Sequence, residues 1–145
     1  MKKIISLFLL TLLIFTTYNS QAAEKEIILK SSQSWDGNIV NYPKGQAQIT
    51  GVKITLGRGE SMPFHCHPVV TTGYVDSGKI EVEKMDGTKK IFKKGDSIIE
   101  VMNTWHRGHN LSNLRKVKLM VFYAGAKDVP NTILYNEENK DKCSK

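Results

Sequence analysis

The sequence has few cysteines, no long apolar run and no extended helical pattern, and each absence narrows the classes of protein to consider. Only Cys66 and Cys143 occur among the 145 residues, so at most one internal disulfide can form. The longest apolar run, Ile4–Phe15, covers twelve residues, whereas a membrane-spanning helix needs about twenty. No stretch of twelve or more residues after position 25 shows a helical period, which argues against a predominantly helical fold.

The first 22 residues have the composition of a secretory signal peptide. A lysine pair gives a short positive start, the apolar run follows, and Ala22 closes a small-residue site of the kind that a signal peptidase cleaves. The alternative is that the segment stays attached as an uncleaved anchor. We predict a signal peptide at residues 1–22, a single mature domain at residues 23–145 without a stable membrane anchor, and a periplasmic or secreted location.

The chain is basic, with 21 lysines and arginines against 14 acidic residues and a formal net charge of +7. Without the two lysines of the predicted signal peptide, the net charge is +5. Lysines such as Lys116 and Lys118 alternate with apolar residues, which is typical of the solvent face of a sheet. We interpret the charge as a contribution to solubility, with a mild preference for anionic ligands, and expect no nucleic-acid partner.

Alternating apolar and polar residues predict an all-β fold. Residues 52–56, 79–84 and 116–123 alternate in this way, and Asp86-Gly87 is a strong hairpin signal between two such runs. About eight short strands at regular spacing favour a closed antiparallel barrel or jelly roll that encloses a pocket. The polar residues 136–145 are expected to fray.

Three histidines are the candidate functional residues. On a strand, side chains two positions apart lie on one face, about 7 Å apart at their Cα atoms, so His65 and His67 would point the same way and Cys66 the opposite way. His106 follows one hairpin and one strand later, and an antiparallel barrel can return it beside the first pair. Such a set predicts a metal site, while a surface position of the histidine pair is the alternative.

The spacing of these histidines resembles the two sequence motifs of the cupin superfamily. The first motif matches at Gly59, His65, His67 and Gly78, and the second matches at Gly95, His106 and Asn110. The resemblance covers residues 59–110 and implies a small single-domain cupin, which is an antiparallel double-stranded β-helix or jelly-roll barrel. It also implies that His65, His67 and His106 bind a divalent transition metal inside the barrel.

One ligand of the first motif is missing. The position of the motif glutamate is Thr71, or Thr72 with the longer spacing that the family permits. Because threonine is uncharged, three neutral imidazoles would leave a divalent ion with its full positive charge, and such an ion should attract water, hydroxide or an anionic substrate. Imidazole suits Fe, Zn, Ni and Cu, with Mn as a further candidate, and the metal identity stays open.

Further residues are assigned around this centre. Five are expected to line a substrate pocket: Thr71, Thr72, Phe64, Tyr74 and Met102. No general base is expected beside the histidines, because four acidic residues have uncertain or outward parity: Glu60, Glu81, Glu83 and Glu100. Cys66 could pair with Cys143, since disulfides persist in exported proteins.

Three classes of function follow from the sequence. The first is a metal-dependent enzyme acting on a small anionic molecule, of the oxygenase or isomerase type, because the resemblance includes cupin dioxygenases with three-histidine sites. The second is a non-catalytic module that binds or senses a small molecule or metal, and the third is a metal-poor structural barrel. The resemblance also implies a homodimer formed through an edge strand, as is common among small cupins. The fold alone does not choose among these classes.

Overall fold

The structure, a computed structural model, describes residues 23–143. The predicted signal peptide at residues 1–22 lies outside the described residues. Within the described part, the chain forms nine strands and one short 3-10 helix, η1 (Lys140–Cys143). The strands are β1 (Ala47–Leu56), β2 (His65–Cys66), β3 (Val70–Ser77), β4 (Lys79–Lys84), β5 (Lys89–Lys93), β6 (Ser97–Ile99), β7 (His106–Asn110), β8 (Val117–Ala126) and β9 (Ile133–Leu134).

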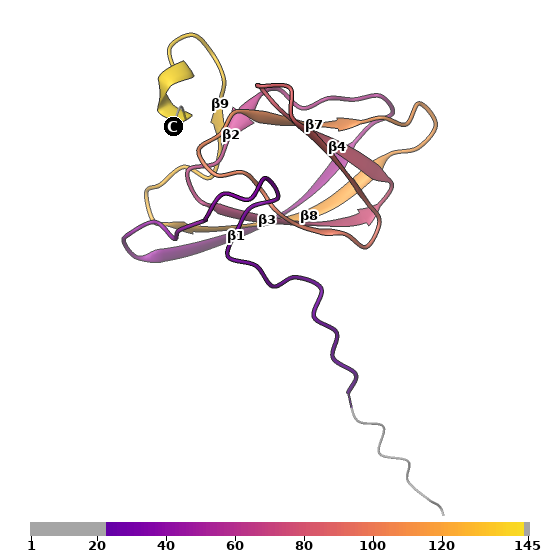
Figure 1. The fold of residues 1–145 in the computed structure, drawn as a ribbon, viewed down its shortest axis with the longest axis horizontal. Coiled ribbons are helices and arrows are strands. Elements are labelled where there is room, and N and C mark those ends of the chain that lie inside the picture. Colours follow the sequence, from indigo (N-terminus) through magenta and orange to yellow (C-terminus); the bar gives the residue numbers. More distant parts are fainter. Residues whose placement is uncertain (1–22, 144–145) are drawn as a thin grey trace, which may run out of the picture.

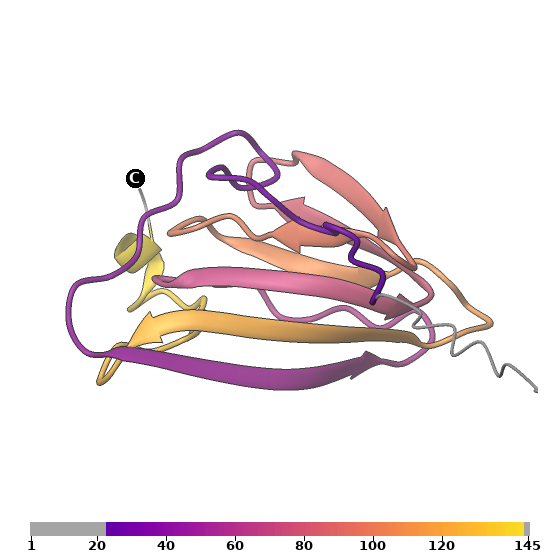
Figure 2. The same cartoon turned by 90° about the horizontal axis from the view of Figure 1, so that it is seen from below.

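The strands make two antiparallel sheets that lie face to face (Figures 1 and 2). One sheet has the order β1-β8-β3-β6, and the other has the order β5-β4-β7-β2-β9. Neighbours in both sheets are mostly distant in sequence, as in the pairing of β3 with β8 and of β2 with β7. The predicted all-β, jelly-roll class is confirmed.

Alternation along the strands builds the core between the sheets. In β8, every second residue from Val117 to Tyr123 is buried, and the intervening lysine, methionine and phenylalanine face outward. In β4, Ile80 and Val82 are buried while their charged neighbours are not. These side chains meet Val75 of β3 in one apolar cluster. The core is therefore formed by the alternate residues of each strand, as the sequence pattern predicted.

The predicted hairpin at Asp86-Gly87 joins β4 to β5. The Thr88 backbone N–H donates to the Asp86 carboxylate, and the Gly87 N–H donates to the Lys84 carbonyl. These bonds satisfy the tip of the hairpin locally, and the Met85 N–H beside it donates to the Trp105 carbonyl over 2.9 Å.

The C-terminal segment is held more firmly than its polarity suggested. Cys143 forms a disulfide with Cys66, and the Trp105 indole N–H donates to the Lys140 carbonyl over 2.9 Å. Figure 1 shows η1 beside the end of the barrel that carries β2 and β9. The expectation of fraying is therefore wrong for residues 136–143, because contacts from distant parts of the chain anchor this helix. In the described residues, no helix has the length and apolarity to cross a membrane.

Candidate metal centre

Two neighbouring strands bring the three histidines together. His65 begins β2 and His106 begins β7, and the two residues are direct partners in the antiparallel ladder. His67 follows β2 on the same face as His65, as expected from their spacing of two. Its carbonyl accepts the Asn103 backbone N–H over 2.9 Å, which ties this end of β2 to the segment that leads into β7.

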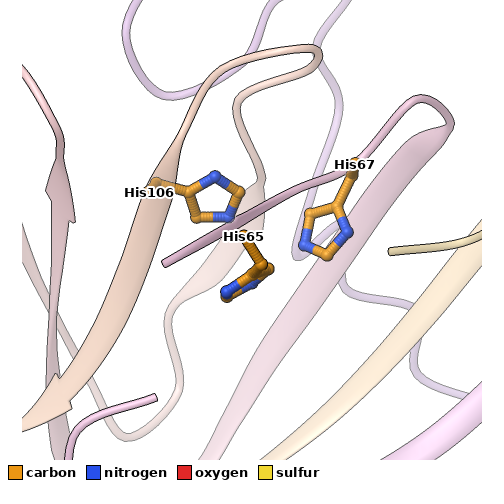
Figure 3. A group of neighbouring side chains, drawn as sticks. All are labelled: His65, His67 and His106. Atoms are coloured by element: carbon orange, nitrogen blue, oxygen red, sulfur yellow. The ribbon is translucent and has the colours of Figure 1, made fainter. Parts of the chain in front are cut away.

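The imidazole rings converge on a common point inside the barrel (Figure 3). One ring nitrogen from each histidine lies within 4.8 Å of the others. The centroid of the His65 ring is 4.9 Å from that of His67 and 4.6 Å from that of His106. All three residues are at most 6% exposed, so the surface alternative for the pair is wrong.

Backbone carbonyls set the orientation of each ring. The Nδ1 atoms of His65, His67 and His106 each lie 2.8 Å from a carbonyl oxygen, those of Pro63, Asn131 and Thr104 respectively. Because a carbonyl only accepts, each Nδ1 must carry the proton, and Nε2 keeps its lone pair. This is the usual arrangement by which proteins fix the tautomer of a metal-binding imidazole.

Burial favours the neutral form of all three rings. It lowers the pKa of His65, His67 and His106, and the neighbouring rings lower the pKa of His67 further, to about 3. A neutral imidazole is the form that binds a metal ion. The donor set therefore fits a divalent transition metal, for which imidazole nitrogen is a good ligand, better than it fits Mg²⁺ or Ca²⁺.

The space around the rings is small and largely apolar. It offers about 30 Å³ to the centres of water-sized molecules, and one water needs roughly 10–15 Å³ by that measure. The polar side chains on its wall are those of the three histidines, Thr71, Glu100 and Tyr123. The remaining lining residues are Ile54, Met62, Ile80, Val82, Gly108, Leu119 and Val121.

Comparison with known proteins agrees with this architecture. Residues 52–123 match the family described as a cupin domain. The chain belongs to the cupin superfamily. No protein of curated function matches the sequence of this cupin.

Several solved structures share its fold. An uncharacterized conserved protein with a double-stranded beta-helix domain from Klebsiella pneumoniae is 19% identical with a TM-score of 0.52, over 68% of this chain and 91% of that one. The DMSP lyase DddQ from Ruegeria pomeroyi is 17% identical with a TM-score of 0.51, over 59% of this chain and 42% of that one. The oxalate decarboxylase from Lactobacillus farciminis, in a formate complex, is 16% identical with a TM-score of 0.53, over 64% of this chain and 28% of that one.

The two named enzymes have much longer chains than this cupin. The matched region spans less than half of the lyase chain and less than a third of the decarboxylase chain. At such identities the likeness shows the fold alone. The chemistry of this cupin therefore has to be argued from its own residues.

The structure corrects the expectation that no carboxylate lies near the histidines. Oε2 of Glu100 is 3.6 Å from Nε2 of His106, and Glu100 lines the same cavity. Burial raises the pKa of Glu100 to about 7. Of the other three acidic residues considered, Glu81 and Glu83 lie on the outer face of β4 and pair with Lys89.

Sequence parity could not place Glu100 because the alternation breaks there. Ile98, Ile99 and Val101 are all buried, at 4%, 7% and 1% exposure, so the flanking residues do not define an inner and an outer face. β6 ends at Ile99, and Glu100 follows it outside the regular strand. The signal available in the sequence is the run of apolar residues around this glutamate, because a carboxylate in an apolar setting needs a partner.

Of the five residues expected to line the substrate pocket, the cavity is lined by Thr71 and not by the other four. Thr72 and Tyr74 have the opposite parity to Thr71 on β3, so their side chains lie on the outer face. Phe64 precedes β2, and the Arg107 guanidinium lies 4.6 Å from the centroid of its ring.

Met102, the fourth of these residues, forms an isolated bridge with His67 through the backbone and is only half-buried. Cys66 faces away from the imidazoles, as its parity predicted, and its disulfide partner Cys143 lies with it in a small cluster beside Trp105. The disulfide therefore lies on the face of β2 opposite to the side chain of His65.

Proposed function

We propose that this cupin is an exported metal-dependent enzyme, of the oxygenase type, that acts on a small anionic molecule. One observation carries the proposal: three buried imidazoles, each with Nδ1 bonded to a carbonyl, turn their Nε2 atoms toward one point. Three protein ligands leave further coordination positions of a transition metal free for substrate or water, which is the arrangement of catalytic rather than structural sites.

The charge of the site supports an anionic substrate. Neutral imidazoles do not reduce the charge of a divalent ion, and a single nearby carboxylate would lower it only to +1. The net positive charge lies in an apolar cavity walled by residues such as Val121 and Leu119, where attraction for an anion is screened little. The oxalate decarboxylase that shares the fold holds formate, an anion of the size class that we propose here.

The volume of the cavity restricts the substrate further. Space for the centres of about two water-sized molecules limits the ligand to a few non-hydrogen atoms. A bound Fe, Mn, Zn, Ni or Cu ion would supply Lewis acidity, and a redox-active one could also activate dioxygen. The chain itself would hold the ion, exclude bulk water with its apolar wall and orient the substrate through Thr71.

The test is oxygen consumption by protein reconstituted with Fe²⁺ and supplied in turn with oxalate, glycolate, formate and short-chain 2-oxo acids. We expect turnover with at least one of these anions and none from His65→Ala/His106→Ala protein treated in the same way. Tight retention of an anion without turnover would instead favour the non-catalytic binding module. Failure of the wild-type protein to retain any transition metal would favour the structural barrel.

A further inference from the structure

We propose that Glu100 is a fourth protein ligand of the metal, supplied by the residue directly after β6, the strand that pairs with β3, where Thr71 takes the place of the motif glutamate. This inference rests on the metal site of the proposed function and adds a ligand that the sequence motif does not contain. Glu100 is set in the chain between β6 and the segment that leads to His106.

The position of Glu100 matches that of the missing carboxylate. β3 and β6 are antiparallel partners with Thr72 opposite Ile99, so the continued register places Thr71 opposite Glu100. The Glu100 backbone N–H donates to the Thr71 carbonyl over 2.8 Å. Side chains that face each other across a ladder are about 4.5–5.5 Å apart at Cβ. The Glu100 side chain can therefore reach from the end of β6 to the space that a glutamate at position 71 would occupy.

Two atoms at this place have no hydrogen-bond partner in the described part of the chain. They are Oε2 of Glu100 and Nε2 of His106, both fully buried and 3.6 Å apart. This separation is too long for a hydrogen bond. It is within reach of two ligands of one ion, because two metal–ligand bonds of about 2.0–2.2 Å can span up to about 4.2 Å. A shared ion would satisfy both atoms at once.

No other group takes the role of partner to this carboxylate. Among residues 23–143, His106 is the one basic residue within ion-pair distance of Glu100. The Thr71 hydroxyl donates to the Val69 carbonyl over 3.2 Å, so its proton points away from the carboxylate. A buried carboxylate without a cationic partner is costly, and a metal ion bound by the three histidines would supply that partner.

The consequence is a site with three nitrogens and one carboxylate oxygen. With this ligand, the net charge of a bound divalent ion and its ligands would be +1 instead of +2. Glu100 thereby restores the ligand chemistry implied by the first motif, although Thr71 occupies the motif position. If Glu100 acted instead as a general base, its carboxylate would lie near the ion without a bond to it. The experiment therefore has to detect the bond between Glu100 and the metal.

Co²⁺ is a suitable probe because its visible absorption reports its coordination. We expect Glu100→Gln to bind Co²⁺ about 10- to 100-fold more weakly in competition with a chelator, the range for loss of a group that supports a metal site, and to show an altered Co²⁺ spectrum. Thr71→Glu/Glu100→Gln should recover affinity and spectrum, because it returns the carboxylate to the motif position. Glu81→Gln, which changes a carboxylate on the outer face of β4, should match the wild type.

Infrared difference spectra of the wild-type protein provide a test that needs no variant. With ¹³C-labelled glutamate, addition of Co²⁺ should produce an isotope-sensitive shift of one carboxylate band. An unchanged affinity and spectrum in folded Glu100→Gln, or the absence of that shift, would overturn the assignment of Glu100 while leaving the three-histidine site intact. If the wild-type protein does not bind Co²⁺ at all, the failure is that of the metal site itself.

Discussion

At the scale of single residues, small backbone requirements position the site. Gly78 ends the first motif at the turn between β3 and β4 with a φ of +84°, a conformation that residues with a side chain rarely adopt. A Cβ placed there would lie 2.9 Å from the Lys116 carbonyl oxygen and 2.9 Å from Cγ2 of Val117. The motif glycine is therefore required both for its φ and for the close approach of β8.

Gly78→Ala should destabilise the protein by about 2–3 kcal/mol, because it combines a strained φ with a backbone clash. Gly87→Ala is the matched control, since Gly87 has a φ of +87° but no atom within 4 Å of the added Cβ, and it should cost about 1 kcal/mol. Urea unfolding of both variants measures the difference. Equal losses would show that the contact with β8 contributes nothing.

The same scale shows where sequence reasoning succeeded and failed for the site. The faces of His65 and His67 followed from a spacing of two, and the cupin motif supplied His106. Glu100 did not follow, because its neighbours are buried on both sides and its partner Thr71 lies 29 positions earlier in the chain. Thr72 and Tyr74 do not reach the cavity because they have the opposite parity to Thr71 on β3, and Met102 lies in the irregular segment before β7, where parity assigns no face.

At the scale of elements, the C-terminal segment supports β2 and the residue after it, where two of the candidate ligands lie. β9 pairs with β2, opposing Leu134 to His65 and Ile133 to Cys66. Asn131 supplies the carbonyl that orients the His67 ring. The Cys66–Cys143 disulfide closes this arrangement across 77 positions of sequence. These contacts join residues that are far apart in sequence, so the composition of the C-terminal segment could not reveal them. Its polarity alone suggested fraying.

Removal of the disulfide should weaken both stability and metal retention. Cys66→Ser/Cys143→Ser should lose about 2–4 kcal/mol of unfolding free energy, the usual contribution of a disulfide. Co²⁺ should also dissociate faster from the variant, because β9 and Asn131 would hold His67 less firmly. Urea unfolding and chelator-chase kinetics measure the two effects.

Reductant provides the control for this prediction. It should lower the stability of the wild-type protein toward that of the double variant and leave the variant unchanged. A variant that is less stable but releases Co²⁺ at the wild-type rate would separate the disulfide from the metal site and contradict the proposed support of His67.

At the scale of the whole molecule, alternation in the strands was enough to predict an all-β barrel, and the motif was enough to predict the cupin fold. The pairing order of the sheets was not readable, because β1-β8-β3-β6 joins strands far apart in sequence. The fold buries three imidazoles that titrate near pH 6.5 when exposed. This burial makes the stability of the metal-free protein dependent on pH.

Metal-free protein should lose stability as the pH falls from about 6.5 toward 3. Burial lowers the pKa of the histidines, that of His67 to about 3, so in this range the unfolded chain binds more protons than the folded one. Glu100, whose pKa is raised to about 7, acts in the opposite direction between about pH 4.5 and 7, but one carboxyl opposes three imidazoles.

Thermal melts at a series of pH values, with chelator present, measure this dependence. His67→Gln should flatten the slope, since a glutamine at this position does not titrate. A melting temperature that is constant or rises on acidification across this range would contradict the burial of three neutral imidazoles.

The most direct test of the central claim is elemental analysis of the protein purified gently from cells that express it. The wild-type protein should carry close to one transition-metal ion per chain, and His65→Ala/His106→Ala protein, confirmed as folded by circular dichroism, should carry almost none. Equal metal content in the two proteins would contradict the account, because the ion would then be held somewhere other than among these imidazoles.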